Sequence, residues 1–206
     1  TSLGSTDNIF MGYDAGGGTW TDVASNHNIA IGNYSMDDAL NGALNNTALG
    51  NYTLSVLTTG DYNVALGYAA GSSLTSGYSN ILIGRSAGGA GTDMIETVII
   101  GHYAGDAINT NNSQGSVLIG YQAGTTMTAG INTYIGYDAG RYSTTGAYNT
   151  ALGYTAFDSA TQLSQNTAVG YATLSAMSGS AGNTLNTAVG YIAGAAVTTG
   201  THNTIL

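Results

Sequence analysis

The side chains that enzymes most often use for catalysis are few in this chain and lie far apart. His27, His102 and His202 are the only histidines, Glu96 is the only glutamate, and cysteine is absent. Zinc sites and catalytic triads need such groups in defined combinations, and no such spacing occurs. We therefore expect no catalytic residue, no metal ligand set and no cofactor, and we do not expect an enzyme.

Carboxylates offer two alternatives. The adjacent pair Asp37 and Asp38 could hold a cation, although a solvated turn is the simpler interpretation. A polysaccharide-cleaving enzyme would need two carboxylates about 5–9.5 Å apart. No repeated position of this chain carries Asp or Glu in successive units, so that activity is kept only as an alternative.

Tyrosine is the remaining side chain with a regular spacing. It follows the glycine of a repeated phrase in seven places, and Arg85 and His102 interrupt the row. One interpretation is that the rings stack between units and leave their hydroxyl groups at the surface. The other is a stripe that contacts a sugar or a surface, and the first is favoured. The residues of this predicted stripe are Tyr13, Tyr68, Tyr121, Tyr137, Tyr154, Tyr171 and Tyr191.

A short repeated phrase must position these tyrosines. Residues 166–170 and 186–190 both have the sequence Asn-Thr-Ala-Val-Gly, and similar phrases occur along the whole chain, most often 17 residues apart. The repeat glycines define eleven complete units and a partial twelfth, so residues 1–206 are one repeat array, which we expect to be a segment of a longer chain. Wider spacings place insertions near residues 19–26, 108–114 and 178–185. The repeat glycines are Gly12, Gly32, Gly50, Gly67, Gly84, Gly101, Gly120, Gly136, Gly153, Gly170 and Gly190.

Each phrase predicts a short β-strand, because β-branched or aliphatic residues stand one and three positions before the glycine. By the strand period of two, these two positions share one face and the residue between them, mostly Ala, has the other. We expect the aliphatic face, Ile100 included, to fill the core. The Ala face, with its larger members Leu82, Ile99 and Leu118, is then expected to lie at a contact between chains.

The rest of each unit predicts turns and one further strand. Where a second glycine is missing, the large residues Met36, Leu54, Phe157 and Leu174 replace it, which indicates packing. In the Thr-Thr-Gly sequences that end at Gly60, Gly146 and Gly200, glycine is expected to supply a positive φ. Asn recurs four residues before the repeat glycine, where it suits a left-handed turn and can form a ladder of amide hydrogen bonds. About 17 residues with two strands and two turns make one coil of an all-β, parallel β-solenoid.

Composition excludes several partners. Lys and Arg number two and Asp and Glu eleven, for a net charge of −9, so we expect neither nucleic acid nor anionic lipid as a partner. No apolar run approaches the roughly 20 residues of a membrane-spanning helix, and no membrane insertion is expected. Both strand faces are apolar, and one of them would be an unusually large exposed patch on a monomer. This favours a homo-oligomer.

The recurring run Asn-Thr-Ala-Val-Gly-Tyr-x-Ala-Gly, followed by Thr-Thr-Gly, resembles the arrays of phage and bacterial tail-fibre-domain proteins. It is also similar to the heads of YadA-like trimeric autotransporter adhesins. The resemblance covers the whole chain, although the period here is longer than in those heads. It implies a β-roll, left-handed in the adhesin heads, with three chains around one axis.

These observations together predict a structural and adhesive fibre segment, a shaft or a head, that is extracellular, at a cell surface or on a virion. The predicted assembly is a homotrimer, with end-to-end filaments as the alternative because open terminal strands can pair. A glycan or another cell-surface receptor is a possible ligand. The alternative functions are a tailspike-like enzyme that degrades polysaccharide and an ice-binding solenoid.

Overall fold

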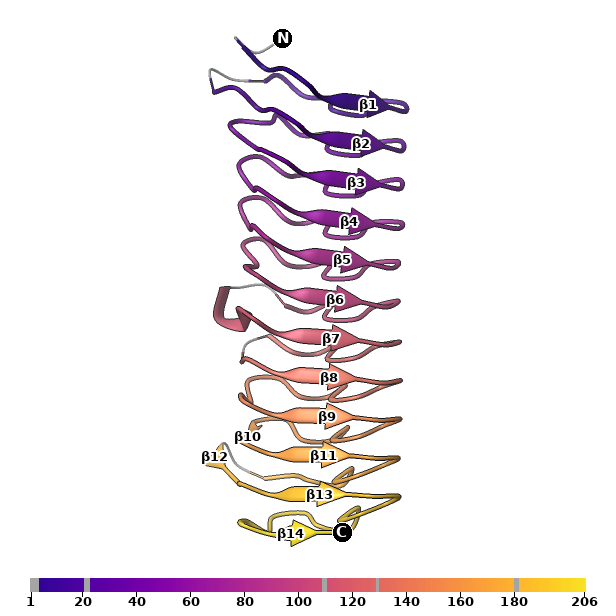
Figure 1. Cartoon of the computed structure of the whole chain (residues 1–206), viewed down its shortest axis with the longest axis vertical. Coiled ribbons are helices and arrows are strands. Elements are labelled where there is room, and N and C mark those ends of the chain that lie inside the picture. The colour runs from indigo at the N-terminus through magenta and orange to yellow at the C-terminus, as the bar shows by residue number, and fades with distance from the viewer. Residues whose placement is uncertain (1–3, 21–22, 109–110, 129, 180–181) are drawn as a thin grey trace.

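Each repeated phrase forms one strand, and the strands stack in chain order along one axis (Figure 1). The computed structural model describes residues 4–20, 23–108, 111–128, 130–179 and 182–206. Its main sheet has twelve parallel strands. They are β1 (Ile9–Met11), β2 (Ile29–Ile31), β3 (Thr47–Leu49), β4 (Val64–Leu66), β5 (Ile81–Ile83), β6 (Val98–Ile100), β7 (Val117–Ile119), β8 (Thr133–Ile135), β9 (Thr150–Leu152), β11 (Thr167–Val169), β13 (Thr187–Val189) and β14 (Thr204–Ile205).

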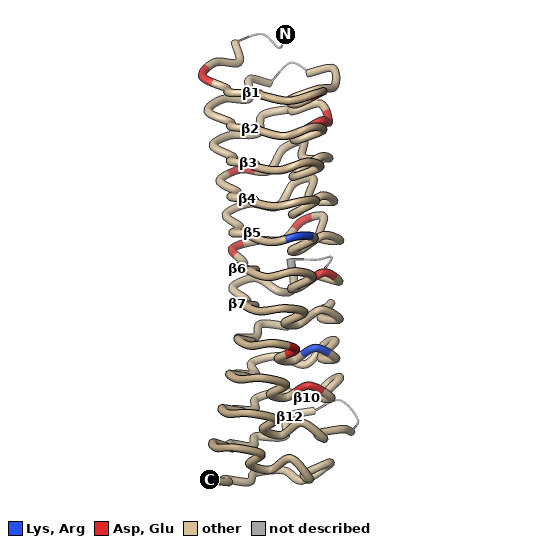
Figure 2. The backbone as a smooth tube through the Cα atoms, turned by 90° about the vertical axis from the view of Figure 1, so that its right-hand side faces the viewer, with Lys and Arg blue, Asp and Glu red and all other residues tan. Residues whose placement is uncertain are grey.

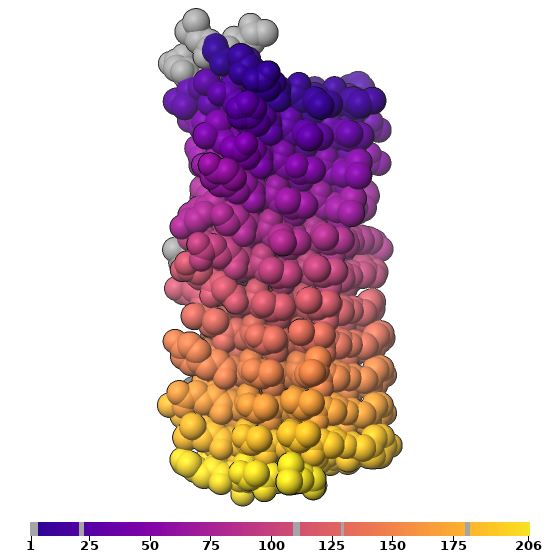
Figure 3. Space-filling model, in the orientation of Figure 1, coloured from indigo at the N-terminus to yellow at the C-terminus, as the bar shows by residue number. Residues whose placement is uncertain are grey.

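Equivalent residues of successive repeats are paired in register. Ala30 pairs with Ala48, and Leu82 pairs with Ile99. Because each strand is hydrogen-bonded to the coil before and the coil after it, no coil has to be stable alone. The predicted parallel β-solenoid of about 17 residues per coil is confirmed, and the stacked coils make a rod (Figure 3).

The prediction of two strands per coil is wrong for most coils. Among the described residues, a second ladder exists only where β10 (Leu163–Ser164) pairs with β12 (Gly182–Asn183), and Tyr78 makes one bridge to Ile95. Elsewhere in the described part the coil is completed by turns with left-handed residues, such as Tyr34 (φ 57°). These residues bend the chain too sharply for a regular strand.

The three predicted insertions each include residues outside the described part of the chain, namely 21–22 in 19–26, 109–110 in 108–114 and 180–181 in 178–185. Of the second, the structure shows the short 3-10 helix η1 (Asn111–Ser113). Of the third, it shows β12, which extends the small second ladder.

The middle residue of each main-sheet strand points into the rod, and its two neighbours point outward. The middle residues are buried from β2 to β13, whereas neither neighbour is buried in any of these strands. The predicted assignment of faces is therefore wrong: Ile100 and the other aliphatic residues before the glycines face outward. A period of two separates two faces but does not say which is inside, and both faces are apolar here.

Each inward strand residue packs against the residue four positions after the repeat glycine. Where one of these two side chains is large, the other is small. Coils with a large residue in the strand centre have glycine at the second position, as in Phe10 with Gly16, where a Cβ would lie 2.6 Å from the Phe10 ring. Four of the six coils with Ala in the strand centre have a large buried residue there instead. The prediction that these large residues pack is confirmed. The complementary pairs are Phe10/Gly16, Leu82/Gly88, Ile99/Gly105, Leu118/Gly124, Tyr134/Gly140, Ala30/Met36, Ala48/Leu54, Ala151/Phe157 and Ala168/Leu174.

Two coils are small at both positions, and their neighbours fill the space. A Cβ on Gly71 would lie 2.6 Å from Leu82 and 2.9 Å from Leu54, which belong to the coils on either side. Gly194 lies between Leu174 and Ile205 in the same way. The core is thus continuous along the rod, and protein interiors tolerate few voids.

The predicted asparagine ladder is present and buried. Most of these side chains donate from Nδ2 to Oδ1 of the asparagine one coil earlier, as Asn63 does to Asn46 at 3.0 Å. Most also donate to a backbone carbonyl of the coil ahead, as Asn63 does to Gly77 at 2.9 Å. Thr97 and Ser116 take the asparagine position in two coils. The left-handed residue lies one position before the asparagine, for example Tyr62 (φ 56°), so the asparagine is chosen for its amide rather than for its own φ.

The glycines of the Thr-Thr-Gly sequences differ from the prediction. Gly60 and Gly146 are not among the residues with positive φ. They are glycines because a Cβ would collide with the backbone carbonyl of the next coil, Gly77 O above Gly60 and Leu163 O above Gly146. Their own carbonyls accept the asparagine amides, from Asn46 and Asn132. Close approach of coils therefore selects glycine here.

Candidate functional site

The predicted tyrosine stripe lies along one corner of the rod, just past the end of each strand. The repeat glycine has a φ of +141° in Gly12 and +127° in Gly84, and its missing side chain lets the next coil approach. The residue after it is turned out of the sheet into solvent. All seven predicted tyrosines are exposed, from 37% at Tyr121 to 75% at Tyr191.

Rings of neighbouring coils stack on one another. From Tyr121 to Tyr191 the centroids of successive rings are 4.8 to 5.3 Å apart, and the ring planes differ by 5° to 19°. Most ring faces in this part are therefore covered by another ring. A ligand can reach the ring edges and hydroxyl groups, but it cannot lie flat on an inner ring, as a sugar would in a stacking contact.

Two further tyrosines complete the stripe at its N-terminal end. Tyr34 stacks on Tyr52 at 5.1 Å and meets Tyr13 edge to face at 5.4 Å, and Tyr52 contacts Tyr68 at 5.7 Å. Their position is one residue later than in the other coils. The sequence signal is an Asn-Tyr pair after the glycine: Asn33 and Asn51 take the usual tyrosine position, and each accepts a backbone N–H of the coil before it.

Arg85 and His102 continue the stripe rather than ending it. The Arg85 guanidinium lies 6.0 Å from the ring centre of Tyr68 and 5.6 Å from that of Tyr103. His102 stacks on Tyr103 at 4.3 Å and meets the edge of Tyr121 at 5.6 Å. A cation and an imidazole therefore join two runs of phenol rings.

The outward face of the main sheet is a second candidate surface. It consists of two apolar columns, the first and third residues of each strand, and it contains no Asp, Glu, Lys or Arg. Ile9 and Met11 are 51% and 59% exposed. The first column is Ile or Val in most strands from β1 to β7 and Thr from β8 to β14, so the face becomes more polar along the rod.

The remaining polar candidates do not assemble into a catalytic arrangement. His27 lies 3.9 Å from Asp7, and both side chains are exposed. Asp37 has a raised pKa because of partial burial and the nearby carboxylates of Asp14 and Asp38. Within the described ranges, no three His, Cys, Asp or Glu side chains lie close enough to hold a metal ion.

One acidic pair is partly removed from solvent. Asp138 accepts a hydrogen bond from Arg141 at 3.3 Å, and its other carboxylate oxygen is buried without a partner among the described residues. Burial raises the pKa of Asp158, the charge of Asp138 raises it further, and Arg141 acts in the opposite direction. The charged positions are otherwise sparse along the rod (Figure 2).

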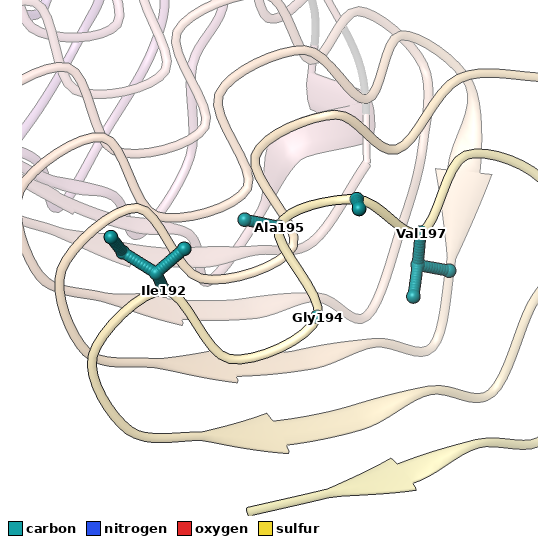
Figure 4. Close-up of a pocket in the computed structure, with 5 residues that line it drawn as sticks. Ile192, Gly194, Ala195 and Val197 are labelled. Carbon is teal, nitrogen blue, oxygen red and sulfur yellow. The ribbon is translucent and has the colours of Figure 1, made fainter.

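Two hollows occur near the C-terminal end. One, of about 590 Å³, is lined by Ile192 and residues 194–197, and Figure 4 shows that its lining side chains come from a single turn of the coil. The other, of about 260 Å³, lies beside β12, with Thr184 and Thr199 in its wall. Neither contains any of the predicted site residues.

No described helix is long and apolar enough to cross a membrane. No known protein family, curated protein or solved structure matches the chain.

Proposed function

We propose that this chain is a structural and adhesive segment of a fibre that is displayed outside a cell or on a virion, and that it assembles as a homotrimer. The observation that carries the proposal is the outward face of the main sheet, an apolar stripe that extends along the whole rod. Parallel sheets are normally covered on both faces. Exposed apolar patches of this extent mark interaction surfaces.

The occupant proposed for this face is the same face of two further copies. The face carries no charge that would select a different partner, so contacts between identical apolar columns suffice. A strand such as β5 is only three residues long, so the sheet face is narrow across the rod. Three such narrow faces can close around an axis and exclude water. A parallel arrangement places the threonine-rich end of each copy beside that of its partners, whereas an antiparallel one would bury threonine hydroxyls against isoleucine.

A rod with this core suits a mechanical role. The continuous core, the asparagine ladder and the in-register sheet link every coil to both neighbours. Stability is then distributed along the array rather than concentrated at one site. We propose no enzymatic activity.

Solution mass tests the assembly. Light scattering is expected to give about three times the chain mass of 20.7 kDa. The variant Ile100→Asp, with Leu66→Asp added, places charge on the outward face and is expected to give a folded monomer. A wild-type protein that stays a soluble monomer at high concentration contradicts the proposal, and masses that grow without limit support end-to-end filaments instead.

A further inference from the structure

The tyrosine stripe changes its chemistry at one place, in the coils of β5 and β6. Ten of the eleven coils contribute a tyrosine to the stripe, either directly after the glycine or one residue later, as Tyr34 and Tyr103 do. The exception is the coil of β5, where Arg85 follows the glycine, and in the next coil His102 stands between the glycine and Tyr103. The guanidinium is placed between the rings of Tyr68 and Tyr103, and the imidazole lies against Tyr103.

Arg85 differs from the other cation of the chain. Arg141, the only other residue among Lys and Arg, donates to the carboxylate of Asp138. Arg85 forms no ion pair with a carboxylate of the described residues, and its side chain is exposed. Its planar fork of five N–H donors is free to face an incoming acceptor, and this fork matches a carboxylate with two parallel hydrogen bonds.

His102 lies beside the guanidinium on the C-terminal side. Its imidazole stacks on Tyr103 at 4.3 Å, and its Nε2 atom is buried. A buried atom is out of reach of an incoming ligand, so His102 supports the ring of Tyr103 and does not itself contact the carboxylate.

We propose that Arg85, with the flanking rings of Tyr68 and Tyr103, binds the carboxylate of an acidic sugar residue in a glycan. One unpaired guanidinium matches one carboxylate, and the net charge of −9 repels polyanions such as nucleic acid. The aromatic rings beside the cation provide apolar edges for the sugar carbons. The inference rests on the proposed role of the rod as an adhesive fibre segment.

Assembly would multiply a weak contact. A single carboxylate on one arginine is expected to bind at roughly millimolar concentration. In a trimer with parallel chains, three such sites lie at the same height of the rod. Linked sites gain affinity through effective concentration, so a glycan surface would be held far more tightly than one soluble sugar.

Saturation-transfer NMR on the intact chain tests the site with three small probes: methyl glucuronide, methyl glucoside and acetate. Methyl glucuronide is expected to bind saturably and at least about tenfold more tightly than either of the others, because it alone combines the carboxylate with a sugar ring. The variant Arg85→Gln is expected to abolish this binding. The matched control Arg141→Gln, the other arginine of the chain, is expected to retain it.

Several results would overturn the proposal. Equal binding of glucuronide and glucoside would show that the charge is not recognised, and equal binding of acetate would show that the sugar is not. Full binding by Arg85→Gln would place the site elsewhere. Light scattering on the same samples separates this inference from the proposed assembly: a trimer that binds no glucuronide contradicts the site alone, and a monomer that binds it contradicts the assembly alone.

Discussion

The inner and outer columns of the same strands differ in a way that hydrophobicity does not reveal. Inside the rod, six of the ten buried strand centres from β2 to β13 are alanine, namely Ala30, Ala48, Ala65, Ala151, Ala168 and Ala188. Outside, the flanking columns are rich in isoleucine, leucine and valine. The more apolar face is thus the exposed one. Complementary volume, rather than apolar character, identifies the core.

Charge in the inner column is expected to have the largest effect. Leu118→Asp buries a carboxylate with no partner, which should cost at least several kcal/mol and abolish the cooperative melting of the rod. Ile100→Asp, one coil away in an outer column, should melt as a folded protein and lose only its assembly. Circular dichroism with light scattering separates the two, and equal destabilisation by both would refute the assigned faces.

Exchanging a large and a small residue within the core is expected to have the second-largest effect. Phe157→Gly should lower the free energy of unfolding by about 3–5 kcal/mol because it leaves a cavity. Ala151→Leu alone should lower it by about 1–3 kcal/mol because it overpacks the core. Combined, they recreate the pattern of the Leu118/Gly124 coil and should recover a coupling energy of about 1–3 kcal/mol. Denaturant unfolding of the four proteins measures this coupling, and simple additivity would contradict the compensation.

Removal of one ring from the stripe is expected to have a smaller effect. Tyr154 stacks on Tyr137 at 5.1 Å and on Tyr171 at 5.3 Å. Tyr154→Ala should therefore lower the free energy of unfolding by roughly 0.5–1.5 kcal/mol for each stacked pair that is lost, and the circular dichroism spectrum should not change. Tyr148→Ala, at an exposed tyrosine for which no ring contact is observed among the described residues, is the matched control. A loss as large for Tyr148→Ala would show that stacking is not the cause.

The smallest effect concerns pH. The folded-state pKa of Asp158 is raised above its ordinary value of 3.8 by burial and by Asp138, so the folded rod binds this proton more tightly than the unfolded chain does. The contribution of Asp158 to stability is then greatest below 3.8 and is lost as the pH rises through the raised value. Asp158→Asn should remove this dependence and raise the melting temperature at neutral pH by a few degrees at most. A variant with an unchanged pH profile would contradict this.

The residues alone determined the architecture, because a repeat at a fixed spacing can satisfy its backbone only by pairing each unit with the next. The phrase from Asn166 to Gly170 predicts the strand and the ladder of asparagine amides, and the tyrosine that follows it, Tyr171, is expected to keep its hydroxyl group at the surface. These features depend on local sequence and on identity between coils. Both are visible without coordinates.

Only the tertiary structure decided which strand face is inside, which turn residues are left-handed and which tyrosines join the stripe. These properties depend on contacts between positions that are separated within a coil or lie in different coils. The sequence nevertheless contains a signal that identifies the core, namely pairs of positions at which a large residue occurs with a small one. Tyr134 occurs with Gly140, and Ala151 occurs with Phe157. A three-residue strand with two apolar faces leaves the choice open, and the fixed volume of the interior resolves it.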